Sequence, residues 1–373
     1  MNLIYFELKK VWQTRKTHLF LLLSLSLIIV LFFFNGFMAH KEQQEIAEVN
    51  PTAEALNQKS FNDKLKHSLE EMNQEILMQE ETFQIMANEG KSLDGKLTLP
   101  TYPLYRMNLN DELVKKKLPP QSMRYGTKNS IFTAILVSYL ASGLGLIILF
   151  LLFGDSLTKE MEDNSLYFYL AQPIQRGRLF LTKYILTWAQ SVVVIGLFLV
   201  FGFIFASVFS GGSSFFYPVI AFSNMTMDFI PIIQYIGQVY LLFTFVLAFC
   251  FSLHFLVSIF LKKTSLSLII TMVLLFEGYS ISMLNSEFTR KIAPFNPFIY
   301  LNSSKIFVGY DFHPFATRLV ENQEYYANWC LPRTIHNAQI SNVNGMITLS
   351  IGTAILLLIG YFCFKKNFHL WKE

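Results

Sequence analysis

The sequence predicts an all-α polytopic membrane protein with six transmembrane helices and two extracytoplasmic regions, the first of which contains a long amphipathic helix. Three observations lead to this prediction: composition, apolar runs and the placement of basic residues. Of the 373 residues, 53% are hydrophobic and 15% are charged, whereas soluble domains carry about 25% charged residues. This excess of apolar side chains excludes a water-soluble enzyme and a disordered chain.

Six apolar runs are each close to the roughly 20 residues that cross about 30 Å of hydrocarbon. Uncharged runs of this length are not expected from the core packing of a soluble protein. The first run is too long for the apolar part of a signal peptide and lacks a small-residue cleavage pattern, so we expect it to remain in the protein. The predicted spans are 18–38, 131–153, 184–210, 231–261, 264–285 and 345–364.

Lysine and arginine residues predict the orientation of these spans. Basic residues occur in the short segments 1–17, 154–183, 262–263 and 365–373, whereas the connection 211–230 has none. The basic segments all fall on one side of a six-span topology, and short basic loops face the cytoplasm. We therefore expect a multi-pass protein of a bacterial cell membrane, surrounded by lipid, with both termini cytoplasmic. The net charge of +4 is too small to predict a nucleic-acid partner.

Three segments outside the spans have patterns of their own. Residues 3–16 read as an amphipathic helix at the membrane surface or as an extension of the first span. The external region 39–130 contains apolar residues at helical spacing over roughly 52–88, which predicts an amphipathic helix. In the second external region, 286–344, the prolines of 294–297 predict a short helix that dips into the interface or a tight turn over the spans.

We find no motif for a nucleotide, a metal or a catalytic site. Residues 90–96 resemble the start of a phosphate-binding loop, but Leu97 stands where serine or threonine would hold magnesium. No hydrophobic strand precedes this segment. The cysteines and histidines lack metal-ligand spacing. We therefore expect no catalytic residue, no metal and no cofactor in this chain.

Two ionisable residues lie inside predicted spans, where such residues are costly and often functional. We expect Glu277 to lie in the outer half of the membrane, and His254, in the preceding span, to lie in the inner half. A transport path is one interpretation of both. Alternatively, Glu277 faces a wet cavity or the headgroups, and His254 is a hydrogen-bonded residue between helices. Neither has a partner at catalytic spacing in its own span, which argues against an intramembrane enzyme.

The segment 155–183 between the second and third spans is the most informative part of the chain. Acidic residues come first, then Asn164 and Ser165 as a predicted helix N-cap, then a short aromatic stretch, a proline and basic residues. Exposed aromatic side chains on a short loop favour a docking surface, although a helix resting in the headgroups is the alternative. The residues expected to contact a partner are Glu160, Glu162, Asn164, Ser165, Tyr167, Tyr169, Pro173 and Arg176.

This order of residues resembles the first cytoplasmic loop of permease subunits of ABC-2 type transporters. The matching residues are Glu160 or Glu162, Leu170, Pro173, Arg176 and Lys183, with Asn164 and Ser165 where the family commonly has Gly-Thr. The resemblance implies that residues 156–172 form a coupling helix in a groove of a separate ABC ATPase subunit. It also implies two permeases, as two copies or a copy and a paralogue, with two ATPases that bind ATP and Mg²⁺.

The resemblance implies a permease for ATP-driven export of an amphipathic peptide, an antibiotic or a lipid-like cargo. Alternating access of this kind needs a bundle with two stable arrangements rather than covalent chemistry. One alternative is a non-transporting subunit of a signalling or regulatory complex that is coupled to an ATPase. A second, less favoured alternative is an intramembrane enzyme, which would be active without an ATPase partner.

Overall fold

The structure is a computed structural model, which describes part of the chain. The residues that it describes are 3–49, 67, 70, 71, 74, 77, 78, 109, 111–119, 121–163, 165, 166, 175–223, 226–284, 286–307, 330–335 and 337–367.

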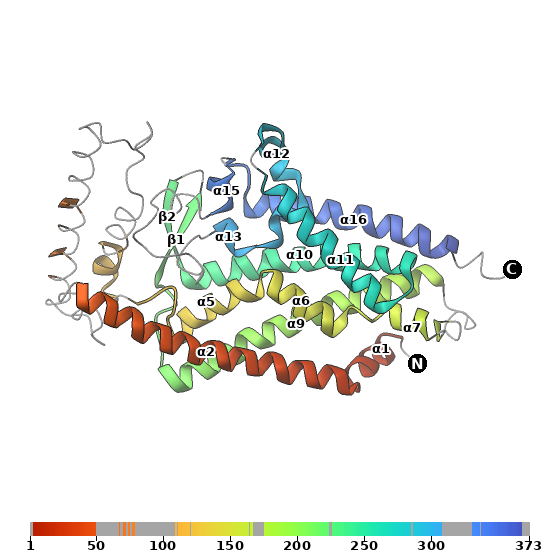
Figure 1. Ribbon diagram of the computed structural model, residues 1–373, viewed down its shortest axis with the longest axis horizontal. Coiled ribbons are helices and arrows are strands. Elements are labelled where there is room, and N and C mark those ends of the chain that lie inside the picture. Colours follow the sequence, from red (N-terminus) through yellow and green to blue (C-terminus); the bar gives the residue numbers. More distant parts are fainter. Residues whose placement is uncertain are drawn as a thin grey trace.

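The described residues form a bundle of long apolar helices (Figure 1). Within the described residues, five helices are long and apolar enough to cross a membrane, and a sixth crossing is formed if one bent pair of helices counts as a single span. This confirms the predicted fold class. The five are α2 (Arg15–Val49), α9 (Arg176–Ser210), α10 (Ile232–Leu261), α11 (Thr264–Ser282) and α16 (Asn342–Asn367).

Helix α10 lies at the centre of the bundle and packs against α5, α9, α11 and α16. In its apolar window 72% of the residues are buried, whereas the value is 17% for both α11 and α16. The outer faces of α11 and α16 carry exposed isoleucine, leucine, valine and phenylalanine side chains. Such surfaces need an apolar solvent, which the hydrocarbon of a bilayer provides.

The predicted span 131–153 is divided into two helices. Helix α5 (Asn129–Leu140) and helix α6 (Gly143–Phe153) meet at an angle of 69°. The carbonyl oxygen of Ala141, which a continuous helix would use internally, accepts the backbone N–H of Ser303 at 3.2 Å. The Ser142 hydroxyl donates to the carbonyl of Tyr139 at 2.6 Å. These contacts satisfy backbone groups that the break frees, as an apolar environment requires.

One end of the bundle, which we call the hairpin end, carries a two-stranded antiparallel hairpin that the sequence analysis did not predict (Figure 1). Its strands are β1 (Pro218–Ser223) and β2 (Thr226–Pro231), with Val219 opposite Ile230. The amphipathic helix predicted for residues 52–88 falls largely outside the described residues. The short helices of the second external region are α12 (Glu287–Ile292), η2 (Ala293–Phe295), η3 (Pro297–Leu301), α13 (Ser304–Phe307) and α15 (Leu331–Thr334).

The proline-rich segment of η2 and η3 is a tight turn packed on α10, α11 and α16. The hydroxyls of Tyr300 and Thr348 both donate to the carbonyl oxygen of Pro294, at 2.9 and 3.0 Å. The ring of Phe298 meets Phe249 of α10 edge to face, with centroids 5.5 Å apart. The structure combines the two predicted forms, because η2 and η3 are short helices that make a turn packed over the spans.

The opposite end of the bundle, the elbow end, contains α1 (Leu3–Trp12), α7 (Thr158–Glu162) and the last turns of α16 (Figure 1). Helix α1 is separate from α2 and packs on α9 and α2. Trp12 is partly buried and packs against the hydrophobic core. Helix α1 is therefore attached to the bundle and is not a simple continuation of the first span.

Candidate functional site

The chain turns sharply where α6 ends, and we call residues 154–163 of this turn and helix α7 the elbow. Gly154 ends α6, and its backbone N–H donates to the carbonyl of Phe150 at 2.8 Å. A side chain at Gly154 would place its Cβ 2.5 Å from Leu268 Cδ2 and 2.6 Å from the Phe150 carbonyl oxygen. Only glycine allows this approach, so the sequence lets the elbow lie close against α11.

Helix α7 carries two carboxylates that point in different directions. Positions two apart on a helix are separated by about 200°, so Glu160 and Glu162 lie on nearly opposite faces. The side chain of Glu160 is 1% exposed, whereas Glu162 is exposed. One carboxylate therefore faces the protein interior and the other faces outward.

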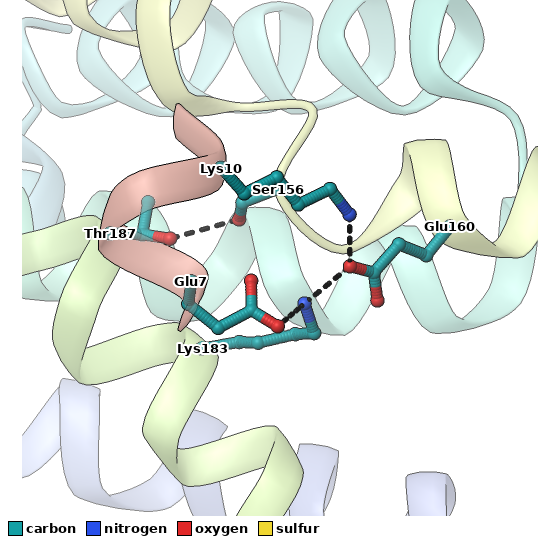
Figure 2. Close-up of polar contacts among 6 residues, drawn as sticks. All are labelled: Glu7, Lys10, Ser156, Glu160, Lys183 and Thr187. Atoms are coloured by element: carbon teal, nitrogen blue, oxygen red, sulfur yellow. Dashed lines mark hydrogen bonds and ion pairs between the residues drawn. The ribbon is translucent and has the colours of Figure 1, made fainter. Parts of the chain in front are cut away.

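The inward carboxylate belongs to a cluster of four charges (Figure 2). Glu160 Oε1 accepts from Lys10 Nζ of α1 at 2.6 Å and from Lys183 Nζ of α9 at 2.8 Å. Lys183 Nζ also donates to Glu7 Oε1 of α1 at 3.0 Å. Two carboxylates and two ammonium groups thus join α1, α7 and α9.

Burial decides how much each pair in this cluster matters. The side chains of Lys183 and Glu7 are 1% and 9% exposed, whereas that of Lys10 is 39% exposed. A buried charge that loses its partner destabilises a protein by about 3–5 kcal/mol, whereas exposed pairs contribute about 1 kcal/mol or less. Lys183 is therefore the buried centre of the cluster. Lys10 is its most exposed member, so the Lys10–Glu160 pair is the one that can most easily separate.

The outward carboxylate binds the start of α11. Glu162 Oε2 accepts the backbone N–H of Thr264 at 3.2 Å, and Thr264 is the first residue of α11. The hydrogen bonds from Thr264, together with the charge of Lys263, hold the pKa of Glu162 below its ordinary value. A carboxylate at the start of a helix is also favoured by the helix dipole. Glu162 thus joins the elbow to α11.

Three further contacts join the elbow to other helices. Lys16 Nζ of α2 donates to Asp155 Oδ2 at 2.8 Å, and the hydroxyls of Ser156 and Thr187 of α9 are 2.8 Å apart. His254 Nε2 of α10 lies 2.6 Å from the carbonyl oxygen of Gly154. A carbonyl oxygen only accepts, so Nε2 carries the hydrogen. Through these and the carboxylates, the elbow is bonded to α1, α2, α9, α10 and α11.

The structure places only some of the residues predicted to contact a partner. Glu162 is exposed and Ser165 is half-buried, while Arg176 is the first residue of α9. Glu160 is buried, so it is not assigned to the outer surface. Helix α7 ends at Glu162, before the predicted N-cap at Asn164 and Ser165, and Leu166, directly after Ser165, is helical. Asn164, Tyr167, Tyr169 and Pro173 lie outside the described residues.

The two ionisable span residues are not brought together. His254 is buried and its Nδ1 lies 3.0 Å from the Thr271 hydroxyl of α11. Glu277 is exposed on α11, six positions past Thr271 and therefore about 9 Å farther along the helix. His254 fits the alternative of a hydrogen-bonded residue between helices. Across the described residues, no group of three or more His, Cys, Asp or Glu side chains is placed to hold a metal ion.

Sequence reasoning missed several residues that form the contacts of the elbow. Asp155 and Ser156 of the elbow itself, its partners Thr187 and Thr264, and Glu7 of the charge cluster were not singled out. Glu7 carries one signal that could have found it, because it is the only acidic residue in 1–41 and lies among basic residues. The hydroxyl residues carry no such signal, since serine and threonine are common in spans of this chain.

Comparison with known proteins gives one match. The family model described as ABC-2 family transporter protein matches residues 1–367. Neither the curated proteins nor the solved structures gave a match.

Proposed function

Because this chain belongs to the ABC-2 family of transporter proteins, we propose that it is the permease subunit of an exporter driven by a separate ATPase chain. The elbow carries this proposal. It is a short helix at one end of the bundle, and polar contacts join it to α1, α2, α9, α10 and α11. A force applied to the elbow would reach each of these helices.

The two carboxylates of α7 connect the elbow to different helices, so a force on the elbow would be transmitted through both. Glu160 leads to α1 and α9 through Lys10 and Lys183, at 2.6 and 2.8 Å. Glu162 leads to the first turn of α11 through Thr264, at 3.2 Å. A tilt of α7 would therefore move the ends of helices on both of its sides. Motion of packed helices between two discrete arrangements is the way that alternating access works.

The elbow end is proposed to face the cytoplasm, with both termini on that side. Lys9, Arg15, Lys159, Arg178 and Lys262 are among the basic residues that lie in its short segments, and short basic segments remain in the cytoplasm. The ATPase would meet the elbow there. This orientation places the ATP-binding chain in the compartment that holds ATP.

The contact with the ATPase is assigned to the outward side of the elbow. Glu162, Ser165, Tyr167, Tyr169 and Pro173 are the proposed contact residues, and residues 156–172 take the place of the coupling helix. Asn164 and Arg176 are further proposed contact residues. Glu160 is instead a link inside the permease, because its carboxylate is buried and binds two lysines.

The remaining parts of the proposal concern composition and cargo. Two permeases, either two copies or a copy and a paralogue, would work with two ATPases that bind ATP and Mg²⁺. The cargo is proposed to be an amphipathic peptide, an antibiotic or a lipid-like molecule. Glu277, which is exposed on α11, is proposed to face the transport path, whereas His254 is proposed to hold the elbow to α10.

Co-purification tests the proposal. We expect the tagged permease to recover an ATPase chain with a complete phosphate-binding loop. Glu162→Lys should reduce this recovery by about tenfold or more, because it reverses a charge at the contact. The matched control is Glu287→Lys, which reverses an exposed charge of α12 and should leave recovery unchanged.

Transport is tested in vesicles that contain the purified complex. We expect ATP-dependent movement of an amphipathic cargo, and coupled loss of transport and of stimulated ATP hydrolysis in Glu162→Lys. Intact coupling without movement of any cargo would favour the signalling alternative. Recovery of no ATPase by the wild-type chain would overturn the proposal.

A further inference from the structure

A small open pocket of about 60 Å³ lies between the α1–α2 turn and the end of α6. Its lining includes Ser156 and Lys159 of the segment 156–172, but none of the proposed contact residues Glu162, Ser165, Tyr167, Tyr169 and Pro173. One wall comes from α1 and α2 and the other from the elbow. Its lining residues are Glu7, Lys10, Thr14, Lys16, Thr17, Leu152, Phe153, Asp155, Ser156 and Lys159.

Three lysines line this pocket, and its two acids already have partners. Glu7 binds Lys183, and Asp155 binds Lys16. The side chains of Lys10 and Lys16 are 39% and 40% exposed, and each ammonium group has three donors, of which its carboxylate needs one. Lys159 is exposed. The pocket therefore offers free ammonium donors and an excess of one positive charge.

The rest of the lining suits one end of an amphipathic molecule. Leu152 and Phe153 are buried apolar residues in the last turn of α6. The hydroxyls of Thr14 and Thr17, which lie 2.9 Å apart, and that of Ser156, which contacts Thr187, also line the pocket. Ammonium and hydroxyl groups together match the oxygens of a phosphate. Apolar side chains beside them match the first part of an acyl chain.

The position of the pocket along the bundle favours a lipid over a soluble phosphate. Lys16 lies three residues before Leu19, where the apolar part of α2 begins, and Phe153 ends the apolar helix α6. Both boundaries mark the edge of the hydrocarbon, where the headgroups of a bilayer lie. Lys9 and Arg15, which are exposed nearby in the sequence, add positive charge at the same level.

We propose that this pocket binds the phosphate headgroup of an anionic phospholipid of the leaflet at the elbow end. Basic pockets between membrane helices are suited to such headgroups. The lipid phosphate shares Lys10 and Lys16 with Glu160 and Asp155, which are the carboxylates that attach the elbow to α1 and α2. Binding of the lipid therefore adjusts how firmly the elbow is held. This last step rests on the proposed function, whereas the site itself does not.

Native mass spectrometry of the full chain in detergent tests the site without an ATPase. The protein is titrated with phosphatidylglycerol, and separately with phosphatidylcholine, whose choline cation opposes the lysines. We expect one phosphatidylglycerol to be retained more strongly than phosphatidylcholine. Lys159→Gln keeps the ion pairs of the elbow and should weaken retention about fivefold, the equivalent of about 1 kcal/mol for a lysine near the surface.

The double variant Lys16→Gln/Lys159→Gln should weaken retention more than Lys159→Gln alone, because it removes a second ammonium group and leaves the Asp155 carboxylate of the pocket without its partner. The matched control is Lys366→Gln, which removes an exposed lysine of α16 outside the pocket and should leave retention unchanged. A thermal unfolding curve for each variant confirms that it is folded. Glycerol 3-phosphate at the same concentration should not displace the lipid.

Three results would overturn the inference. The first is equal retention of the two lipids by the wild-type chain. The second is unchanged retention of phosphatidylglycerol in the folded Lys159→Gln protein. The third is displacement of the lipid by glycerol 3-phosphate, which would assign the pocket to a soluble phosphate. Each of them leaves the proposed role of the elbow in ATPase contact untouched.

Discussion

The two ends of the bundle hold their connecting segments with different chemistry. At the elbow end, charged groups bind the elbow: Glu160 to two lysines and Glu162 to the start of α11. At the hairpin end, the turn of η2 and η3 is held by neutral hydroxyl groups on the Pro294 carbonyl and by ring packing of Phe298. Charged contacts are strong only while all partners are present, whereas neutral packing tolerates the loss of one group.

Removing the central cation of the elbow end should have the largest effect. Lys183→Met leaves Glu7 and Glu160 as buried carboxylates near each other, without the cation that both contact. We expect a loss of about 3–5 kcal/mol in the free energy of unfolding, measured by denaturant titration in detergent.

The matched control for this variant is Lys291→Met. Its pair with Glu287 has side chains that are 75% and 85% exposed, so its removal should cost about 1 kcal/mol or less. Equal effects of the two substitutions would remove the distinction between a buried charge cluster and ordinary exposed pairs.

A substitution at the hairpin end tests whether its neutral contacts tolerate the loss of one group. Tyr300→Phe removes one hydroxyl from the Pro294 carbonyl, which keeps its bond from Thr348 at 3.0 Å. Because the acceptor stays satisfied, we expect a loss of about 1 kcal/mol in the same titration. The double variant Tyr300→Phe/Thr348→Val should lose more than the sum of the single variants, since only then does the oxygen lack both donors. Additive losses would contradict this interpretation.

The outward carboxylate should have the smallest effect and a defined pH dependence. Its pKa in the folded protein lies below the ordinary value, so the Glu162 contact stabilises the fold at pH values above the ordinary carboxyl pKa. That stabilisation is lost as the pH falls through the lowered pKa. Wild type should therefore unfold at slightly higher denaturant than Glu162→Gln at neutral pH, and the difference should vanish in acid. A difference that grows in acid would show that the sign is wrong.

The apolar helices were predictable because each corresponds to a continuous apolar run in the sequence. The break at Ala141 and Ser142 was not, because it depends on the Ser303 N–H that fills the freed carbonyl. The burial of Glu160 was not predictable either. Its partner Lys183 is 23 positions away, and Lys183 binds Glu7 across 176 positions. An acid in a loop normally faces water, and only the three-dimensional arrangement reveals these lysines.

Within the candidate site, too, some features could be predicted from the sequence and others could not. The position and acidic start of the elbow were visible in the sequence, and so was the absence of a nucleotide motif. The hairpin over residues 218–231 was not recognised, because its strands are short and the segment was assigned only as a connection between spans. The roles of Glu160 and Glu162 separate only when the faces of α7 are known.

Photo-cross-linking from the elbow tests the central claim most directly. A photoreactive amino acid is placed at Ser165, directly after the elbow, and in a second protein at Ser286, the N-cap of α12. Products from intact cells are identified by mass spectrometry. Contact between the elbow and a motor subunit predicts an adduct with an ATP-binding chain from position 165 and none from position 286. An adduct with that chain from position 286, or none from position 165, would contradict the account.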